Sequence, residues 1–278
     1  MKHFILLFTL LCCATWSQAQ ETALYECLYQ YKVNGTDKNG QPFSDIYNGI
    51  LQISASQAKF MDYTDFQSDS VTQARPDDVE LQKEYGIQVL KNPCYFDQTV
   101  YQNLPQGKMT VLSVITPDRY VYTEDLNHMA WTLAEGTDTI CGYPCRKATG
   151  TYGGRTWTAW YAEEIPISFG PWKLAGLPGL ILEATDSENI HRFSAISFRK
   201  AKIGIRPLDA TNTLSITRDK FVKAKNLFEK DPVKNLPIEA ISEMEVRKFG
   251  EGAQAKSISI NGVPLRLHPN GYVPLEIQ

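Results

Sequence analysis

The sequence predicts a mainly β fold of the α+β class, with a curved antiparallel sheet in meander order and a few helices covering one side. Two observations predict the sheet. Between residues 95 and 163, six short runs rich in Val, Thr and aromatic residues recur about every ten residues, separated by Gly, Asp, Asn or Pro. Tyr, Phe and Trp make up 11% of the chain, which favours sheets over helical bundles. A change to a helical period near residue 217 places helices late in the chain.

The first 19 residues have the pattern of a secretory signal peptide. A positively charged start precedes an apolar run at residues 4–13, and Ser-Gln-Ala at 17–19 forms a small-x-small cleavage site. The apolar run is too short to span a bilayer. Cys12 or Cys13 leaves lipoprotein acylation as an alternative. We expect residues 20–278 to form one exported domain, periplasmic or associated with the outer membrane, without a transmembrane segment.

In the first part of this domain, the sequence predicts strands joined by polar turns. The strand segments are residues 24–33, 46–54, 58–64, 96–104, 108–116, 119–125, 129–136, 145–152 and 155–163. Aromatic residues occur on both faces of the last segment, so we expect that strand to lie centrally and to be covered on both sides. Residues 76–90 begin with Pro and two Asp residues and fit a short helix that runs into a strand.

The second part predicts two more strands and then helices. Residues 179–186 and 192–203 form the strands, and residues 217–231 have apolar positions three or four apart, as in a helix. Residues 237–250 fit a second short helix that ends at a glycine. The segment 256–277 returns to a strand pattern with an Asn-Gly hairpin signal.

Charge and cysteine usage limit the classes of function. The net charge is -3 with both signs mixed, which excludes a nucleic-acid binder built on a general basic field. Four cysteines follow the signal segment, and in an oxidising compartment they are possible disulfide partners in any of three pairings. They are Cys27, Cys94, Cys141 and Cys145. The last two are separated by three residues, which matches neither a redox C-x-x-C nor a zinc knuckle, so no metal site is predicted.

Motifs of common enzymes are absent. Residues 170–179 lack the spacing of a phosphate-binding loop, and their prolines remove N–H groups that would bind phosphate. Neither G-x-S-x-G nor H-E-x-x-H occurs. The histidines beyond the signal segment are His128, His191 and His268, and none has a visible nucleophile partner. We therefore predict no catalytic residues and no cofactor, and a binding protein is expected rather than an enzyme.

One loop, residues 165–181, is both stiff and apolar. Three prolines fix φ and three glycines allow sharp turns, while the side chains of Leu174, Leu177, Leu180 and Ile181 would each be worth roughly 1.5–3 kcal/mol when fully buried. The loop therefore either covers the sheet as a lid or presents a preformed apolar surface to a partner. A preordered loop loses less entropy in either role.

The segment around this loop resembles a known family. Residues 142–186 are similar to the signature of the GLPGLI family of exported Bacteroidetes proteins, whose motif stands here at residues 176–181. Further matches are Gly142-Tyr143, Cys145, Lys147-Ala148, Arg155, Ala159-Trp160-Tyr161, Ile165-Pro166-Ile167 and Gly170-Pro171-Trp172. The resemblance implies export and a β-rich domain near outer-membrane transport systems, but no reaction. Cys141 departs from the family pattern. In architecture alone, the predicted fold also resembles periplasmic lipoprotein carriers.

The leading hypothesis is an exported binding or accessory protein whose loop docks an apolar ligand, a peptide or an outer-membrane transport component. The residues assigned to binding are Arg155, Trp160, Tyr161, Pro171, Trp172, Lys173, Leu174, Gly176, Leu177, Pro178 and Gly179. Trp172 and Leu174 would be the anchors, and Arg155 and Lys173 would form a polar rim. An envelope hydrolase without a visible site is the first alternative. Metal handling by Cys141, Cys145, His191 and methionines is the second.

Overall fold

The structure is a computed structural model that describes residues 21–92, 95–232, 234–236, 241–249, 252–260, 263–264 and 266–277. The predicted signal segment and Cys94 lie outside these residues. Within them, twelve strands form one sheet in the order β12-β6-β5-β4-β3-β2-β1-β11-β10-β9-β8-β7. Neighbours along the sheet pair antiparallel, except that β12 pairs parallel with β6. The predicted mainly β fold is confirmed.

The predicted single meander is corrected to two, β1–β6 and β7–β11, which join where β1 pairs with β11, so that β6 and β7 are not neighbours in the sheet. The strands are β1 (Thr22–Thr36), β2 (Pro42–Ile53), β3 (Ala58–Asp62), β4 (Gln98–Gln102), β5 (Lys108–Ile115), β6 (Asp118–Asp125), β7 (Thr132–Ile140), β8 (Tyr143–Tyr152), β9 (Arg155–Ala162), β10 (Leu180–Asp186), β11 (His191–Gly204) and β12 (Thr213–Ser215). The helices are α1 (Tyr63–Ala74), α2 (Val79–Lys91) and α3 (Arg218–Lys230). A second sheet pairs β13 (Ile241–Phe249), β14 (Gly252–Ile260) and β15 (Val263–Pro264).

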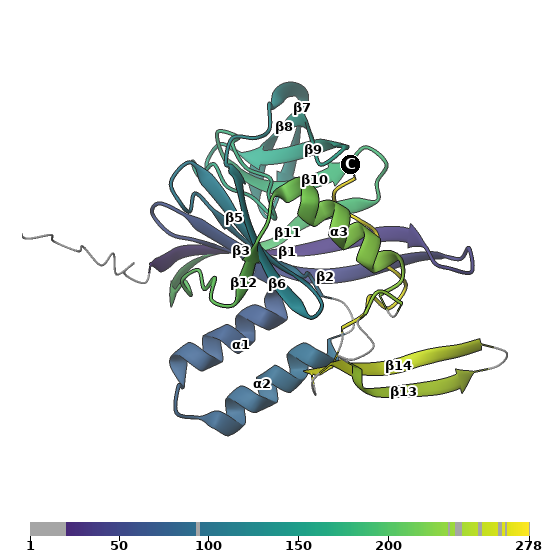
Figure 1. Ribbon diagram of the computed structural model, residues 1–278. Helices are drawn as coiled ribbons and strands as arrows, with labels where there is room; N and C mark the ends of the chain where they lie inside the picture. Colours follow the sequence, from purple (N-terminus) through teal and green to yellow (C-terminus); the bar gives the residue numbers. More distant parts are fainter. Residues whose placement is uncertain are drawn as a thin grey trace, which may run out of the picture.

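The twelve-stranded sheet has two covered faces. The inner face carries the main core, which includes Phe60 of β3, Phe221 of α3 and Leu174 of the stiff apolar loop at residues 165–181, called the Gly/Pro loop from here on. The outer face carries a smaller core in which Met61 packs with Phe66 of α1. Successive residues of a strand point to opposite faces, so Phe60 and Met61 belong to different cores. Figure 1 shows α1 and α2 side by side on the outer face and α3 across the sheet from them.

The helices differ from the sequence prediction at three places, two of them between residues 63 and 91. Residues 79–91 are helical throughout and do not run into a strand. Helix α1 was not predicted, because Phe66 is its only buried residue and no apolar period marks it. It starts at Asp62, whose side chain accepts hydrogen bonds from the N–H groups of Thr64 and Asp65. The helix predicted at 217–231 is confirmed as α3.

The helix predicted at residues 237–250 is wrong. Its described part is the strand β13, which pairs antiparallel with β14. Strand β14 in turn pairs with β15, and the predicted Asn-Gly turn, whose two residues lie outside the described ones, falls between these two strands. Glu, Met, Arg and Lys favour a helix locally, but pairing of β13 with the next strand along the chain, β14, overrides a propensity of this size.

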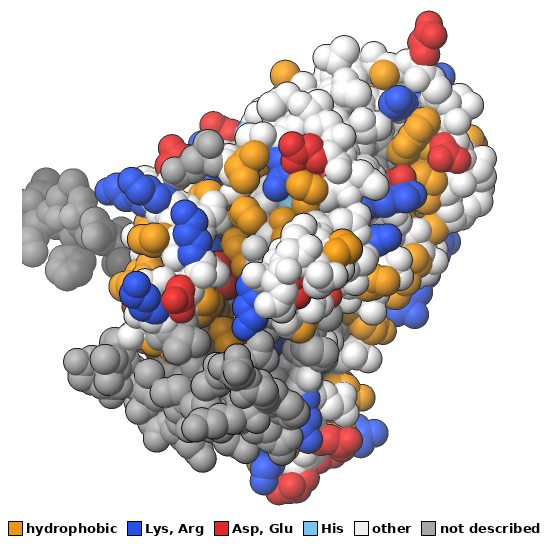
Figure 2. All heavy atoms as spheres, turned by 90° about the vertical axis from the view of Figure 1, so that its right-hand side faces the viewer, with side chains coloured by type: hydrophobic (Ala, Val, Ile, Leu, Met, Phe, Trp, Pro, Cys, Tyr) orange, Lys and Arg blue, Asp and Glu red, His pale blue; other side chains and the backbone are white. Residues whose placement is uncertain are grey.

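Charged side chains of both signs are scattered over the described surface in Figure 2, as the small net charge indicates. None of the helices in the described ranges is long and apolar enough to cross a membrane.

Candidate functional site

The Gly/Pro loop between β9 and β10 is folded into the inner face of the sheet. Trp172, Lys173 and Leu174 are each 0% exposed. Two glutamines of β4 hold the loop: Gln102 donates from Nε2 to the carbonyl oxygens of Gly170 and Trp172, both at 2.7 Å, and Gln98 accepts from the Trp172 indole N–H at 2.9 Å. The loop therefore covers the core of the protein.

The residues assigned to docking are accordingly not at the surface. The anchors Trp172 and Leu174 have no exposed area, and Arg155 and Lys173 are buried instead of forming a rim. Tyr161, Pro171, Leu177 and Gly179 are also buried, Trp160 is half-buried, and only Gly176 and Pro178 are exposed. The physical reason is the aromatic packing of Trp172, whose ring lies 5.5 Å from that of Tyr152 and 5.8 Å from that of Trp157. Of the two predicted roles for the loop, the structure shows the lid.

Lys173 instead lies at the centre of a buried polar cluster. Its Nζ lies 2.6 Å from Glu276 and 2.9 Å from Glu124, and it donates to the hydroxyls of Tyr122 at 2.8 Å and Tyr152 at 3.1 Å. Burial alone would lower the pKa of Lys173, but the Tyr122, Glu276, Tyr152 and Glu124 groups raise it well above its usual value. The ammonium therefore stays charged and is a structural cation rather than a nucleophile.

Arg155 belongs to a second buried cluster. Its Nη1 lies 2.7 Å from Asp186, whose other oxygen accepts from the N–H groups of Ile190 and His191. The imidazole of His191 lies 2.8 Å from the Tyr31 hydroxyl through Nδ1. Burial first, and the Arg155 charge second, lower the pKa of His191 to about 4. His191 is thus a neutral core residue, and its two ring nitrogens are already engaged, by the Tyr31 hydroxyl and by the Pro274 carbonyl at 3.1 Å, rather than open to a metal ion.

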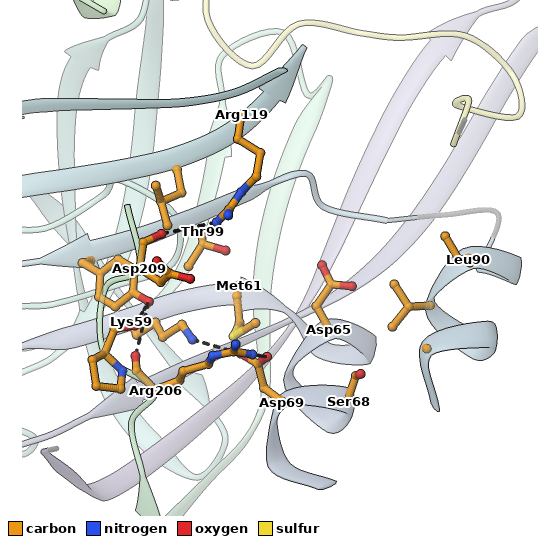
Figure 3. Close-up of a pocket in the computed structure, with 15 residues that line it drawn as sticks. Lys59, Met61, Asp65, Ser68, Asp69, Leu90, Thr99, Arg119, Arg206 and Asp209 are labelled. Atoms are coloured by element: carbon orange, nitrogen blue, oxygen red, sulfur yellow. Dashed lines mark hydrogen bonds and ion pairs between the residues drawn. The ribbon is translucent and has the colours of Figure 1, made fainter. Parts of the chain in front are cut away.

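An open cleft lies on the outer face instead, between α1–α2 and strands β3–β6. Its volume is about 390 Å³. It is lined by Lys59, Met61, Asp65, Ser68, Asp69, Gly86, Val89, Leu90, Thr99, Tyr101, Leu112, Arg119, Arg206, Pro207 and Asp209. Figure 3 shows Arg119, Lys59 and Arg206 on the sheet side of this cleft, with Asp65, Ser68 and Asp69 of α1 facing them. The cleft is the candidate functional site.

Most charges in the cleft are already paired. Asp69 lies 3.3 Å from the Lys59 ammonium and 2.5 Å from the Arg206 guanidinium, so these three groups fix one another. Burial lowers the pKa of Lys59, and Asp69 opposes that shift. Arg119 differs: its guanidinium donates only to the main-chain carbonyls of Asp209 and Thr211, both at 3.3 Å, and within the described ranges it forms no ion pair with a carboxylate. Its charge is available to a ligand.

Asp65 is a carboxyl group of the cleft whose pKa is strongly raised. Burial and the nearby Asp62 carboxylate raise the pKa of Asp65 to about 7, while Arg266, 3.7 Å away, lowers it in part. A carboxyl group of this kind can accept or donate a proton near neutral pH. The sequence carried a weak signal for it, because Asp65 and Asp69 are four residues apart and share one face of a helix. That signal was missed because α1 itself was not predicted.

A set of side chains suited to a metal ion lies elsewhere. Ligand atoms of Asp97, Glu229 and His268 lie within 4.8 Å of one another. The Lys225 ammonium lies 2.6 Å from Asp97 and 2.8 Å from Glu229, so an internal cation already forms ion pairs with both carboxylates. A divalent ion would have to displace it.

The three described cysteines form no disulfide with one another, and Cys94, the fourth possible partner, lies outside the described residues. Cys27 and Cys145 are buried, and Cys141 is exposed. Burial raises the pKa of Cys27 to about 12 and that of Cys145 to about 11, so both are unreactive at neutral pH. Cys141 and Cys145 do not form the predicted metal-handling group with His191, because His191 is enclosed in the core.

Comparison with known proteins matches one part of the chain to a family model. A family model described as "Protein of unknown function (Porph_ging)" matches residues 151–183, which include the Gly/Pro loop and most of the segment that resembles the GLPGLI family. No curated protein matches the chain. Two solved structures of PNGF-II, in the P21 and C2 space groups, are similar with TM-scores of 0.47 and 0.44 and 15% identity. They cover 73% and 83% of this chain, which spans 33% and 35% of theirs.

Proposed function

We propose that the protein is an exported binding protein whose cleft takes a small ligand with an apolar body and an anionic group. The observation that carries this proposal is Arg119, an exposed cation that lines a cleft of about 390 Å³ and forms no ion pair with a carboxylate of the described residues. Charged hydrogen bonds to such a group are among the strongest available to a ligand.

The rest of the cleft suits the same ligand. Its volume lies within the range of about 300–1,000 Å³ typical of small-molecule sites. Met61, Leu90 and Leu112 supply apolar walls from three different elements. The Lys59–Asp69–Arg206 group joins α1 to the sheet side of the cleft and is fixed before a ligand arrives. Preorganisation of this kind lowers the entropy lost on binding.

The Gly/Pro loop then serves the function indirectly. By filling the inner face, it holds β4 through Gln98 and Gln102, and the alternate residues Thr99 and Tyr101 of the same strand line the cleft on the outer face. The resemblance to an exported family supports a location in the periplasm or at the outer membrane. A transport component there is the partner that would receive or deliver the ligand.

A hydrolase is the second candidate, favoured by Asp65. A carboxyl group whose pKa is raised to about 7 can act as a general base in a cleft that also holds cations. Turnover of a chromogenic ester that Asp65→Asn abolishes would replace the binding proposal by an enzymatic one.

The binding proposal is tested with 1-anilinonaphthalene-8-sulfonate, a probe with an apolar ring system and one sulfonate. Fluorescence titration should show binding to the folded wild-type chain that Arg119→Gln weakens by about tenfold, the loss expected for one charged hydrogen bond. The matched control is Arg192→Gln, because Arg192 is an exposed arginine of β11 that pairs with Glu183 and does not line the cleft. Equal affinity of the wild type and Arg119→Gln would contradict the proposal.

A further inference from the structure

The segment Tyr272–Ile277 lies in a slot on the inner face, away from the cleft. None of its residues belongs to a strand, so no sheet ladder holds it. Buried side chains bind its main chain instead. Arg155 donates to the carbonyl oxygens of Leu275 at 3.1 Å and Pro274 at 2.8 Å, and Nε2 of His191 lies 3.1 Å from the same Pro274 oxygen.

Two further main-chain contacts continue along the segment. The N–H of Ile277 donates to the Gly153 carbonyl at 2.8 Å, and the Asn226 amide donates to the carbonyl of Glu276 at 3.0 Å. Main-chain contacts of this kind bind an extended peptide in a fixed register whatever its side chains are.

Side-chain contacts add sequence preference to the slot. Leu275 is 7% exposed and belongs to the main core. The Glu276 carboxylate lies 2.6 Å from the Lys173 ammonium and 2.6 Å from the Arg218 guanidinium. Without Glu276, the fully buried Lys173 would keep only Glu124 as a carboxylate partner, so the slot requires an anionic residue at this position.

The walls of the slot are fixed by contacts that do not involve the segment. Asp186 orients Arg155 and also accepts two main-chain N–H groups, and Tyr31 orients His191. The turn at Gly153 and Gly154 has positive φ at both residues. A Cβ at Gly154 would collide with the Ile277 carbonyl oxygen, so this turn is shaped to the segment.

We propose that this slot is a peptide-binding site for extended sequences of the pattern Pro-Leu-acidic-apolar, and that residues 274–277 are its resident ligand. A peptide of the same pattern carried by another polypeptide competes with them for Arg155, His191, Lys173 and Arg218. The resident segment is tethered, so its high effective concentration weakens the apparent affinity of any competitor.

The proposal is tested with the synthetic peptide Tyr-Val-Pro-Leu-Glu-Ile, labelled at its amino end, against full-length chains. Leu275→Ala weakens the resident segment but leaves the slot intact, so fluorescence anisotropy should show binding to this variant at least about tenfold tighter than to the wild type. The control peptide with Gln in place of Glu should bind neither chain. Failure of the first peptide to bind the folded variant would overturn the proposal.

A second measurement needs no variant and covers the case in which Leu275→Ala does not fold. Amide hydrogen exchange of the wild-type chain should show faster exchange at Ile277 when the peptide is added at high concentration, because the displaced segment loses its bond to Gly153. Unchanged exchange at Ile277 under these conditions would also overturn the proposal.

Discussion

Trp172 is a large residue in a backbone conformation that normally favours glycine. Its φ is 54°, a region sparsely populated by non-glycine residues, and its side chain is fully buried. The conformation persists because Gln102 binds the Trp172 carbonyl and Gln98 binds the indole N–H. Packing and hydrogen bonds therefore outweigh a local strain of about 1–3 kcal/mol at this residue.

This balance predicts the effect of truncation. Trp172→Ala removes the indole from the core and leaves Gln98 without its partner, so it should lower the free energy of unfolding by about 3–5 kcal/mol in urea denaturation. The control Pro178→Ala changes an exposed residue of the same loop and should cost less than about 1 kcal/mol. A small effect of Trp172→Ala would show that the loop does not act as a lid on the core.

Helix α1 is the element that places the acidic wall of the cleft. It begins at Asp62, which is 1% exposed and accepts from the N–H groups of Thr64, Asp65 and Phe96. One carboxylate thus joins the start of α1 to the segment that enters β4. Helix α2 begins with a weaker cap, because Asp78 accepts a single N–H, that of Leu81, at a more exposed site.

The two caps form a matched pair for mutation. Asp62→Ala leaves three main-chain N–H groups without their partner and should lower the free energy of unfolding by about 2–4 kcal/mol, whereas Asp78→Ala should cost about 1 kcal/mol. Chemical denaturation of both variants measures the difference. Equal losses would mean that Asp62 does no more than cap a helix.

At the scale of the whole molecule, local patterns predicted strands well and long-range contacts poorly. The runs between residues 95 and 163 became β4–β9, because alternation and turn residues are properties of the segment itself. The burial of Trp172 depends on Gln98 and Gln102, about 70 residues earlier, which no local pattern reveals. Likewise, the cleft takes Lys59, Asp65 and Arg119 from three elements with no common spacing.

The buried His191 makes the stability of the whole fold depend on pH. Its pKa of about 4 in the folded protein lies below the 6.5 of an exposed histidine, so the unfolded chain binds a proton first as pH falls. The stability that neutral His191 contributes is therefore complete above pH 6.5 and is lost as pH falls through 4, by up to about 3 kcal/mol in total. Asp65, with its raised pKa, acts in the opposite direction.

Comparison with His191→Gln removes this opposing contribution: the difference in unfolding free energy between wild type and variant should shrink as pH is lowered from 7 to 4. A difference that stays constant across this range would show that His191 is not held neutral in the folded protein.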